Sequence, residues 1–360
     1  MAALALTAAL ATVAHGLKTP PLPAKGMLST SSPVETVNLN GINLKPIYGK
    51  DGKFNWEYAA DVLDNVGKKH VTSFYGFDAA KCNAGKNAWL RFVERTDKLV
   101  KSWEVKAKPL SEAKYAAVIV EARSHPQFEW VVKDVMKMLG PDWALMVYHG
   151  TLNAQFVRDS IGGEASGAHF QPIVSNGVEV PNLTRDTYGR FMSTHGFWDP
   201  IPANIENILV FQTDSAALRP MGPQELASWT QYSMIGAPWD WHVTLLQMQK
   251  AVGQPNPWAG NGGFSMRKVS SSKAAISCMQ HAATILEDKE FVKCFLAMGQ
   301  PVSNWMVAKD FSVESIFHDG MTPFGFHQMW CFLPDDKVAN LLATSAIAHE
   351  CNAADDSICV

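Results

Sequence analysis

The sequence lacks several patterns that would each have assigned it to a class of protein. Its 31 Lys and Arg residues are balanced by 34 Asp and Glu residues and form no basic block, so a nucleic-acid partner is not expected. The six Cys residues contain no CxxC pair and no Cys/His spacing of the zinc-ligand type, which argues against a structural zinc site. Gly260–Gly263 is neither a P-loop nor a Rossmann fingerprint, because no Gly-Lys-Ser/Thr follows and the GxGxxG spacing fails.

The N-terminus lacks charge. Met1–Leu17 contains no Asp, Glu, Lys or Arg and is shorter than the about 20 apolar residues that span a bilayer. Its length suits a secretory signal, and Thr12-Val13-Ala14 fits a small-x-small cleavage site; a disordered Ala-rich leader is the alternative. The N-glycosylation sequon at Asn182 agrees with the secretory route. We therefore favour the lumen of the endoplasmic reticulum or Golgi over the cytoplasm, and expect membrane association only through the N-terminus.

Composition divides the chain into five segments. A stretch rich in Pro, Ser, Thr and Lys reads as a linker, and a Lys-rich stretch that ends in Pro109 reads as a boundary. The segments are a possible signal (1–17), a linker (18–35), an N-terminal extension of unknown role (36–110), an α/β domain (111–335) and a C-terminal tail (336–360). The extension contains an expected helix at Trp56–Val66.

The cysteines suggest one disulfide. Cys351 and Cys359 lie close together in a polar tail and can pair in an oxidising compartment. Cys278 and Cys294 lie in apolar or helical sequence, and we expect them to be buried thiols.

The pattern between residues 116 and 235 predicts alternating strands and helices. Apolar runs at 116–121, 143–148 and 207–211 read as buried strands, and 232–235 reads as another short one. After the first run, a Ser124-x-x-Gln127 capping box predicts a helix whose apolar face ends at Gly140-Pro141. Alternation with short loops predicts an α/β fold with a mostly parallel open sheet and helices on both faces.

The most informative motif is the end of the run Asn207–Phe211, where Thr213-Asp214-Ser215 follows. Ligands of open α/β sheets bind beyond the carboxyl ends of the strands. A carboxylate at this edge can hold a divalent metal and, through it, a diphosphate. The alternative is an Asp that only begins a turn.

Two further motifs are candidates for the same edge. Glu121 and Arg123 end the first strand, where an Arg can pair with phosphate; a surface ion pair is the alternative. Gly262 and Gly263 let the backbone approach a ligand closely, or form an ordinary turn before a strand.

Titratable residues and tryptophans provide the remaining candidates. Glu287-Asp288 begins a probable helix at 289–298, where the helix dipole keeps carboxylates ionised and one of them can act as a general base; a purely structural pair is the alternative.

His327 lies in an aromatic, Gly-containing segment and can complete a metal site with Asp214, or simply pack in the core. Tryptophans in loop-like sequence can line a cleft or belong to the core: Trp239, Trp241, Trp258 and Trp330.

The order of these motifs resembles a known arrangement. The chain from 115 to about 332 is similar to an uncharacterised domain-of-unknown-function family of glycosyltransferase-like proteins, related to GT-A folds. The motifs that carry the resemblance are Val118–Glu121, Leu139–Trp143, His149-Gly150, Phe197-Trp198, Phe211–Ser215, Ile235–Trp239, Gly260–Gly263, Glu287-Asp288, Phe311–Glu314 and Phe324–His327.

The resemblance implies a GT-A-like fold, a nucleotide-sugar donor and a divalent cation, Mn²⁺ or Mg²⁺. Many GT-A enzymes hold the cation with Asp-x-Asp, but here Gln212 replaces the first Asp, which leaves Asp214 and makes His327 the candidate second ligand. By the same analogy Asp288 is the base and Glu287 orients it or binds the acceptor. The implied donor site is Glu121, Arg123, Thr213, Asp214, Ser215, Gly262 and Gly263, with Trp239 and Trp241 beside a glycan, protein or small-molecule acceptor.

Two other functions stay open. Without the first Asp of the metal motif, the protein can be a nucleotide-sugar or glycan-binding protein of the same fold that transfers nothing. A glycoside hydrolase is the third reading, with Glu287 and a second carboxylate such as Glu314 as the acid/base pair.

Overall fold

The protein is described by a computed structural model that covers residues 37–39, 42–44, 72–74, 79–238, 260–279, 286–303, 305–318, 320–353 and 359. The chain forms two units, residues 1–62 and 63–360. In the first unit, β1 (Val37–Leu39) and β2 (Ile42–Leu44) pair as an antiparallel hairpin. The expected helix at Trp56–Val66 lies outside the described residues. Among the helices that are described, none has the length and apolar character needed to cross a membrane.

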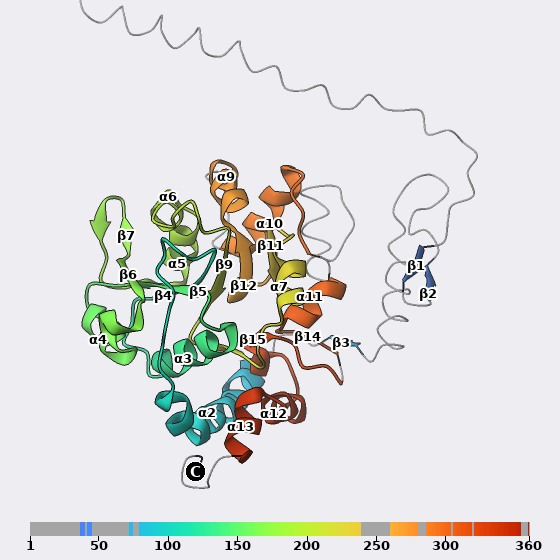
Figure 1. Ribbon diagram of the computed structural model, residues 1–360. Helices are drawn as coiled ribbons and strands as arrows, with labels where there is room; N and C mark the ends of the chain where they lie inside the picture. The colour runs from blue at the N-terminus through green and yellow to red at the C-terminus, as the bar shows by residue number, and fades with distance from the viewer. Residues whose placement is uncertain are drawn as a thin grey trace, which may run out of the picture. The chain divides into compact units, whose positions relative to one another are not determined.

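The second unit is built on a six-stranded sheet of order β11-β12-β9-β4-β5-β6 (Figure 1). Its strands are β4 (Tyr115–Glu121), β5 (Trp143–His149), β6 (His169–Pro172), β9 (Asn207–Phe211), β11 (Met234–Gly236) and β12 (Phe264–Lys268). Strands β9, β4, β5 and β6 are parallel to one another, while β12 is antiparallel to both β9 and β11. The prediction of a mostly parallel open sheet is confirmed.

Both faces of this sheet are buried, which explains why its strands read as continuous apolar runs. In β4, Ala117 and Ile119 belong to one hydrophobic core and Val118 and Val120 to the other. Helix α3 (Phe128–Leu139) covers the first face, and α2 (Ala79–Ser102) packs against α3 and completes the same core. The second face is covered by α5 (Arg185–Met192), α6 (His195–Trp198), α9 (Val269–Met279) and α10 (Glu287–Ala297) (Figure 1).

Helix α3 connects β4 to β5 and buries the apolar face that its sequence predicts. It ends at Gly140, whose φ of 83° is a left-handed conformation that favours glycine. Its start differs from the prediction. The residue before the helix is Gln127, and no side chain caps the helix there, so the capping box from Ser124 is wrong. The reason is that the backbone turns between Arg123 and Phe128 and places the helix start after Gln127.

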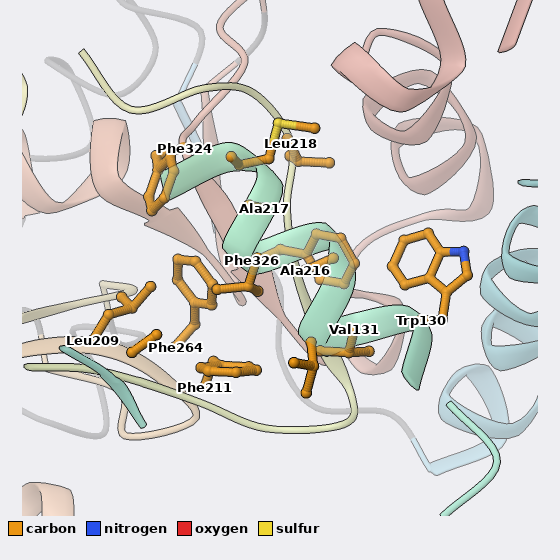
Figure 2. Packing of buried hydrophobic residues seen from close by; sticks show 14 of the residues in the cluster. Trp130, Val131, Leu209, Phe211, Ala216, Ala217, Leu218, Phe264, Phe324 and Phe326 are labelled. Atoms are coloured by element: carbon orange, nitrogen blue, oxygen red, sulfur yellow. The ribbon is translucent and has the colours of Figure 1, made fainter. Parts of the chain in front are cut away.

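A second, three-stranded sheet of order β10-β15-β13 lies beside the first. It contains β10 (Ser215–Ala217), β13 (Ser312–Val313) and β15 (Gly325–His327). Figure 2 shows side chains of one buried cluster that includes Phe211 and Phe264 from the large sheet and Ala216 and Phe326 from the small one. Phe264 packs so closely on Gly325 that a Cβ at that position would overlap its ring. The small sheet is therefore fixed on the large one by buried aromatic packing.

The remaining elements complete the second unit. The helices are α4 (Ala154–Ser160), η1 (Gly163–Ser166), α7 (Pro223–Trp229), α11 (Trp305–Phe311), η2 (Met329–Cys331), α12 (Asp335–Ala343) and α13 (Ala346–Ala353). The strands are β3 (Thr72–Phe74), paired with β14 (Ile316–His318), and the hairpin of β7 (Val174–Ser175) and β8 (Val178–Glu179).

Helix α2, which falls in the segment expected to be an extension, packs against η2, α12 and α13. Trp89 of α2 is 2% exposed and stacks on Trp330 with 5.6 Å between ring centroids. Trp330 is thus a core residue rather than part of a cleft.

Three disulfides are present, of which Cys82–Cys331 joins distant parts of the chain, while Cys278–Cys294 and Cys351–Cys359 join residues 16 and 8 positions apart. The pairing of Cys351 with Cys359 was expected. The expectation of free thiols at Cys278 and Cys294 was wrong, because α9 and α10 pack side by side and bring the two Cα atoms to 5.9 Å.

If α2 is an integral part of the core, replacing Trp89 by Ala should lower the free energy of unfolding by about 3–5 kcal/mol, the usual cost of truncating a buried aromatic residue. Chemical denaturation followed by circular dichroism measures the change. The matched control is Leu152→Ala, at a side chain that is 80% exposed, which should change stability by about 0.5 kcal/mol or less. Equal effects of the two substitutions would show that α2 is dispensable for the fold.

Candidate functional site

The turn that carries Asp214 connects the two sheets. Strand β9 ends at Phe211 and β10 begins at Ser215. The Ser215 hydroxyl closes the turn, since it donates to the carbonyl oxygen of Gln212 at 2.7 Å and accepts from the Gln212 N–H at 3.0 Å. Ser215 is fully buried. Its side chain therefore shapes the turn, whereas Gln212, Thr213 and Asp214 lie beyond the end of the strand.

The neighbouring strand places His327 against Asp214. In the antiparallel pair of β10 and β15, Ser215 lies opposite His327. Nε2 of His327 lies 3.5 Å from Oδ1 of Asp214 and 3.2 Å from Oε1 of Gln212. The side-chain amide of Gln328 donates to Oδ2 of Asp214, and the Gln328 backbone N–H donates to the Asp214 carbonyl at 3.0 Å. The predicted proximity of Asp214 and His327 is thus present in the structure.

The other ring nitrogen of His327 faces a carboxylate. Nδ1 lies 3.0 Å from Oε1 of Glu314, and the same oxygen accepts a hydrogen bond of 2.7 Å from the Asn261 side chain. Asn261 Oδ1 in turn accepts from the Gly263 N–H at 2.9 Å. A chain of contacts therefore fixes the ring of His327 and connects it to the glycine-rich turn.

The charged groups in this cluster shift one another's pKa values. Burial disfavours charge on Asp214, but the neighbouring His327 and the hydrogen bonds from His327 and Gln328 outweigh it and lower the pKa of Asp214 to about 2. Burial likewise lowers the pKa of His327, and the charges of Asp214 and Glu314 outweigh it and raise that pKa to about 10. In this state the imidazole ring is a cation between two carboxylates.

The glycines of the turn 260–263 accommodate protein side chains. A Cβ on Gly263 would overlap the ring of His327, and one on Gly262 would lie 2.5 Å from Oε1 of Glu287. The Gly262 N–H donates to Oδ2 of Asp288 at 3.1 Å. Glycine is required here because His327, Glu287 and Asp288 crowd the backbone, a role different from the expected contact with a donor sugar.

Glu287 and Asp288 begin α10 and have different surroundings. Glu287 forms an ion pair of 3.0 Å with Arg267, a β12 residue whose side chain is fully buried. Burial and the charge of Glu287 raise the pKa of Asp288 to about 7. The prediction that the helix dipole keeps this pKa low was wrong, because desolvation and the adjacent carboxylate exceed the effect of the helix terminus. Asp288 can therefore gain and lose a proton near neutral pH.

A cavity of about 230 Å³ opens between the ends of β4 and β9 and helix α5. It is lined by Val120, Glu121, Ala122, Arg123, Leu183, Thr184, Arg185, Tyr188, Gln212, Thr213 and Asp214. Four of the expected donor-site residues belong to this set: Glu121, Arg123, Thr213 and Asp214. Ser215, Gly262, Gly263, Glu287, Asp288 and His327 lie outside the lining.

Glu121 and Arg123 form a bidentate ion pair at the cavity wall. Both carboxylate oxygens of Glu121 accept from the Arg123 guanidinium at 2.8 Å, and Thr213 donates to one of them at 3.4 Å. The buried Asn153 amide binds the carbonyl oxygens of both residues at 2.9 Å. The Arg123 side chain nevertheless remains 58% exposed, so one face of its guanidinium is open to a ligand.

Helix α5 contributes residues that the sequence did not single out. Thr184 caps the helix, and Arg185 and Tyr188 line the cavity from its first turns. Burial raises the pKa of Tyr188, with the charge of Glu287 adding to the effect, so its hydroxyl stays protonated. A Thr-x-x-Thr cap at 184–187 marks the helix start, but nothing in the sequence places this helix beside β4. Trp239, Trp241 and Trp258 lie outside the described residues.

The donor set around His327 would fit a divalent cation that displaces the proton from Nε2, because only the neutral imidazole ring can ligate a metal. Oδ1 of Asp214 is buried, and within the described part of the chain its partner is Nε2 of His327, in an ion pair of 3.5 Å. Oε1 of Gln212 lies beside Nε2 of His327. The Glu314 carboxylate contacts the other ring nitrogen, and a carboxylate in this position is a common partner of metal-bound histidines. Among the described residues, no three His, Cys, Asp or Glu side chains form a metal cluster. A cation held here would therefore take an amide oxygen, Oε1 of Gln212, as its third protein donor.

Known proteins with similar structures are glycosyltransferases by their descriptions. Mouse xyloside xylosyltransferase 1 in its apo form has 10% identity and a TM-score of 0.39 over 57% of this chain and 97% of that one. The galactosyltransferase LgtC, in complex with donor and acceptor sugar analogues, has 10% identity and a TM-score of 0.39 over 64% and 96%. The mannosyltransferase PcManGT from Pyrobaculum calidifontis, in complex with GDP-Man and Mn²⁺, has 13% identity and a TM-score of 0.33 over 62% and 63%.

At such identities and TM-scores these similarities fix neither an activity nor a ligand. No curated protein is significantly similar to the sequence. Residues 179–327 match the family described as "Protein of unknown function (DUF5672)". The resemblance to an uncharacterised family that was read from the sequence is therefore confirmed over residues 179–327, on a mostly parallel α/β fold.

Proposed function

We propose that the protein is a glycosyltransferase that moves a sugar from a nucleotide-sugar donor to an acceptor hydroxyl with the help of a divalent cation. The observation that carries the proposal is the convergence of Asp214, His327 and Gln212 beside a cavity at the carboxyl ends of β4 and β9.

The position of the cavity supports a nucleotide ligand. From β4 the chain first adds β5 and β6 on one side and then returns to place β9 on the other. Ligands of open α/β sheets bind where the strand order reverses in this way. The exposed face of Arg123 supplies a cation for a phosphate group, and Glu121 holds the guanidinium in a fixed orientation.

The cluster beside the cavity supports a metal-assisted transfer. Asp214, His327 and Gln212 would hold Mn²⁺ or Mg²⁺, which when bound would neutralise charge on the departing diphosphate. Asp288 would accept the proton of the acceptor hydroxyl, for which a carboxylate with a pKa near 7 is suited. Glu287, paired with Arg267, would keep the helix start in place. Trp239 and Trp241 remain the proposed acceptor-side residues.

Three disulfides support an oxidising compartment such as the lumen of the secretory pathway. A glycan, a protein or a small molecule that carries a hydroxyl group would be the acceptor there.

The second candidate is a protein that binds a nucleotide sugar without transferring it. Gln212, an uncharged side chain where many GT-A enzymes have an Asp, favours this reading. A glycosidase is less favoured, because the two carboxylates that would form its acid/base pair have other partners. Glu287 is paired with Arg267, and Glu314 is paired with His327. Isothermal titration with nucleotide sugars and Mn²⁺, combined with product analysis, separates the candidates: binding without product identifies the second.

The proposal predicts that Asp214→Asn weakens Mn²⁺-dependent binding of the donor by about tenfold or more, since the substitution removes the only carboxylate among the three proposed ligands. The measurement is isothermal titration of the donor with Mn²⁺ and with EDTA. Asp142→Asn is the control, because that side chain is 87% exposed and lies outside the cavity lining, with an ion pair of 3.4 Å to Lys108. Unchanged donor affinity in Asp214→Asn would contradict the metal-binding role.

The role of Asp288 predicts a pH profile. Below a pKa of about 7 the carboxyl is protonated and cannot accept the hydroxyl proton, so kcat/KM should rise with pH and level off above neutrality. Asp288→Asn should lower kcat by about 10²–10⁴-fold and abolish this limb. Asp159→Asn, at an exposed position, is the control. A variant that keeps the rising limb would exclude Asp288 as the base.

The same pKa predicts a stability effect that does not depend on activity. The unfolded Asp288 has an ordinary pKa of 3.8, so between that pH and about 7 only the folded protein holds the proton. The contribution of Asp288 to stability is therefore present at acid pH and lost as the pH rises to 7. Relative to the wild type, Asp288→Asn should gain stability from pH 4 to pH 8 in thermal unfolding; a constant difference would contradict the raised pKa.

A further inference from the structure

The sequon Asn182-Leu183-Thr184 is a motif that the proposed function leaves unused. It lies in the loop between β8 and α5, and Thr184 is the residue that caps α5. Asn182 is exposed. Its Oδ1 accepts from the Leu183 N–H at 2.8 Å, whereas its Nδ2 donates no hydrogen bond to the described part of the chain. A glycan on Nδ2 would therefore break no contact of the described fold.

Two exposed apolar side chains lie next to this loop. Leu152 is 80% exposed and Val178 is 66% exposed. The segments that carry them are joined, because the Thr151 N–H donates to the Val180 carbonyl oxygen at 3.1 Å. Val180 in turn precedes Asn182 by two positions. The two apolar side chains therefore lie close to the sequon although they come from different segments.

We infer that Asn182 carries an N-linked glycan and that this glycan covers the exposed surface of Leu152 and Val178. The inference rests on the proposed lumenal compartment and not on sugar transfer by this protein. Apolar side chains that gather on a surface favour association between molecules, and a bulky, solubilising group beside them opposes it. Asn-x-Thr in an exposed loop is the acceptor sequence for such a group in a secreted protein.

The modification is a glycosyl transfer in which Asn182 is the acceptor. The donor is an oligosaccharide joined through a diphosphate to a lipid, and the cell's own secretory machinery supplies it. A bond forms between Nδ2 and C1 of the first sugar, while the bond between C1 and the diphosphate oxygen breaks. The lipid diphosphate leaves with the bonding electron pair, and Nδ2 gives up one proton. Oδ1 keeps its hydrogen bond to the Leu183 N–H.

The full chain, expressed in a eukaryotic secretory host, tests the modification. Its electrophoretic mobility is compared before and after treatment with peptide N-glycosidase, and mass spectrometry locates the modified residue. We expect a mobility shift on treatment that Asn182→Gln abolishes. The control Asn340→Gln, at an exposed asparagine outside any sequon, should keep the shift.

Absence of a shift in the wild type would overturn the inference, and so would a shift that persists in Asn182→Gln. Either result would leave the proposed function standing, because release of nucleotide from a nucleotide sugar is measured separately. A glycosylated chain that releases no nucleotide would contradict the proposed function alone.

A rescue experiment tests the covering role. Asn182→Gln should increase the aggregated fraction in size-exclusion chromatography, because it removes the glycan. Adding Leu152→Ser and Val178→Thr to this variant should return that fraction to the wild-type level, since polar groups then replace the apolar ones. Adding Met298→Gln instead should not rescue it, because this side chain, 38% exposed, follows α10 rather than the sequon loop.

Circular dichroism melting verifies that each variant folds. If Asn182→Gln is not recovered as folded protein, removal of the glycan from the folded wild type with the same enzyme takes its place. An aggregated fraction that does not change on loss of the glycan would contradict the covering role. Aggregation that persists after both apolar side chains are replaced would contradict it as well.

Discussion

The antiparallel pairing of β10 with β15 is the constraint on which the site depends. It places Ser215 opposite His327, and so sets Asp214 beside an imidazole from more than 100 residues later in the chain. The register is fixed by burial, because Phe264 of the large sheet packs on Gly325 while Phe326, the next residue of β15, packs on Trp89 and Trp330. A shift of one residue would turn Phe326 to the opposite face of the small sheet and remove His327 from Asp214.

The fixed register of β10 and β15 is needed because it keeps buried charged groups beside their partners. The side chain of His327 is 10% exposed and that of Asp214 is 30% exposed, and their charges are stable only while these partners stay in place. Asn261 and Gly263 extend the arrangement to the turn before β12, where the absence of side chains at two glycines leaves room for the ring of His327 and the carboxylate of Glu287. The glycine-rich turn and the carboxylates thus form one structural unit, although they are distant in sequence.

The sequence predicted much of the fold because both sheet faces are buried. Continuous apolar runs identified β4, β5 and β9, and the strand ends located Glu121, Arg123 and Asp214 at one edge. It could not show that Tyr188 lines the cavity, since the packing of α5 depends on contacts across the whole second core. It also misjudged the pKa of Asp288, because desolvation depends on the folded environment rather than on a helix start.

The central claim is that the cluster at the end of β9 serves sugar transfer from a nucleotide. The most direct measurement incubates the purified full chain with a panel of nucleotide sugars, with Mn²⁺ or with EDTA, and follows the release of free nucleotide. The account predicts release from one donor that requires Mn²⁺ and increases when a suitable acceptor is present. No release and no binding of any donor in the presence of Mn²⁺ would contradict it.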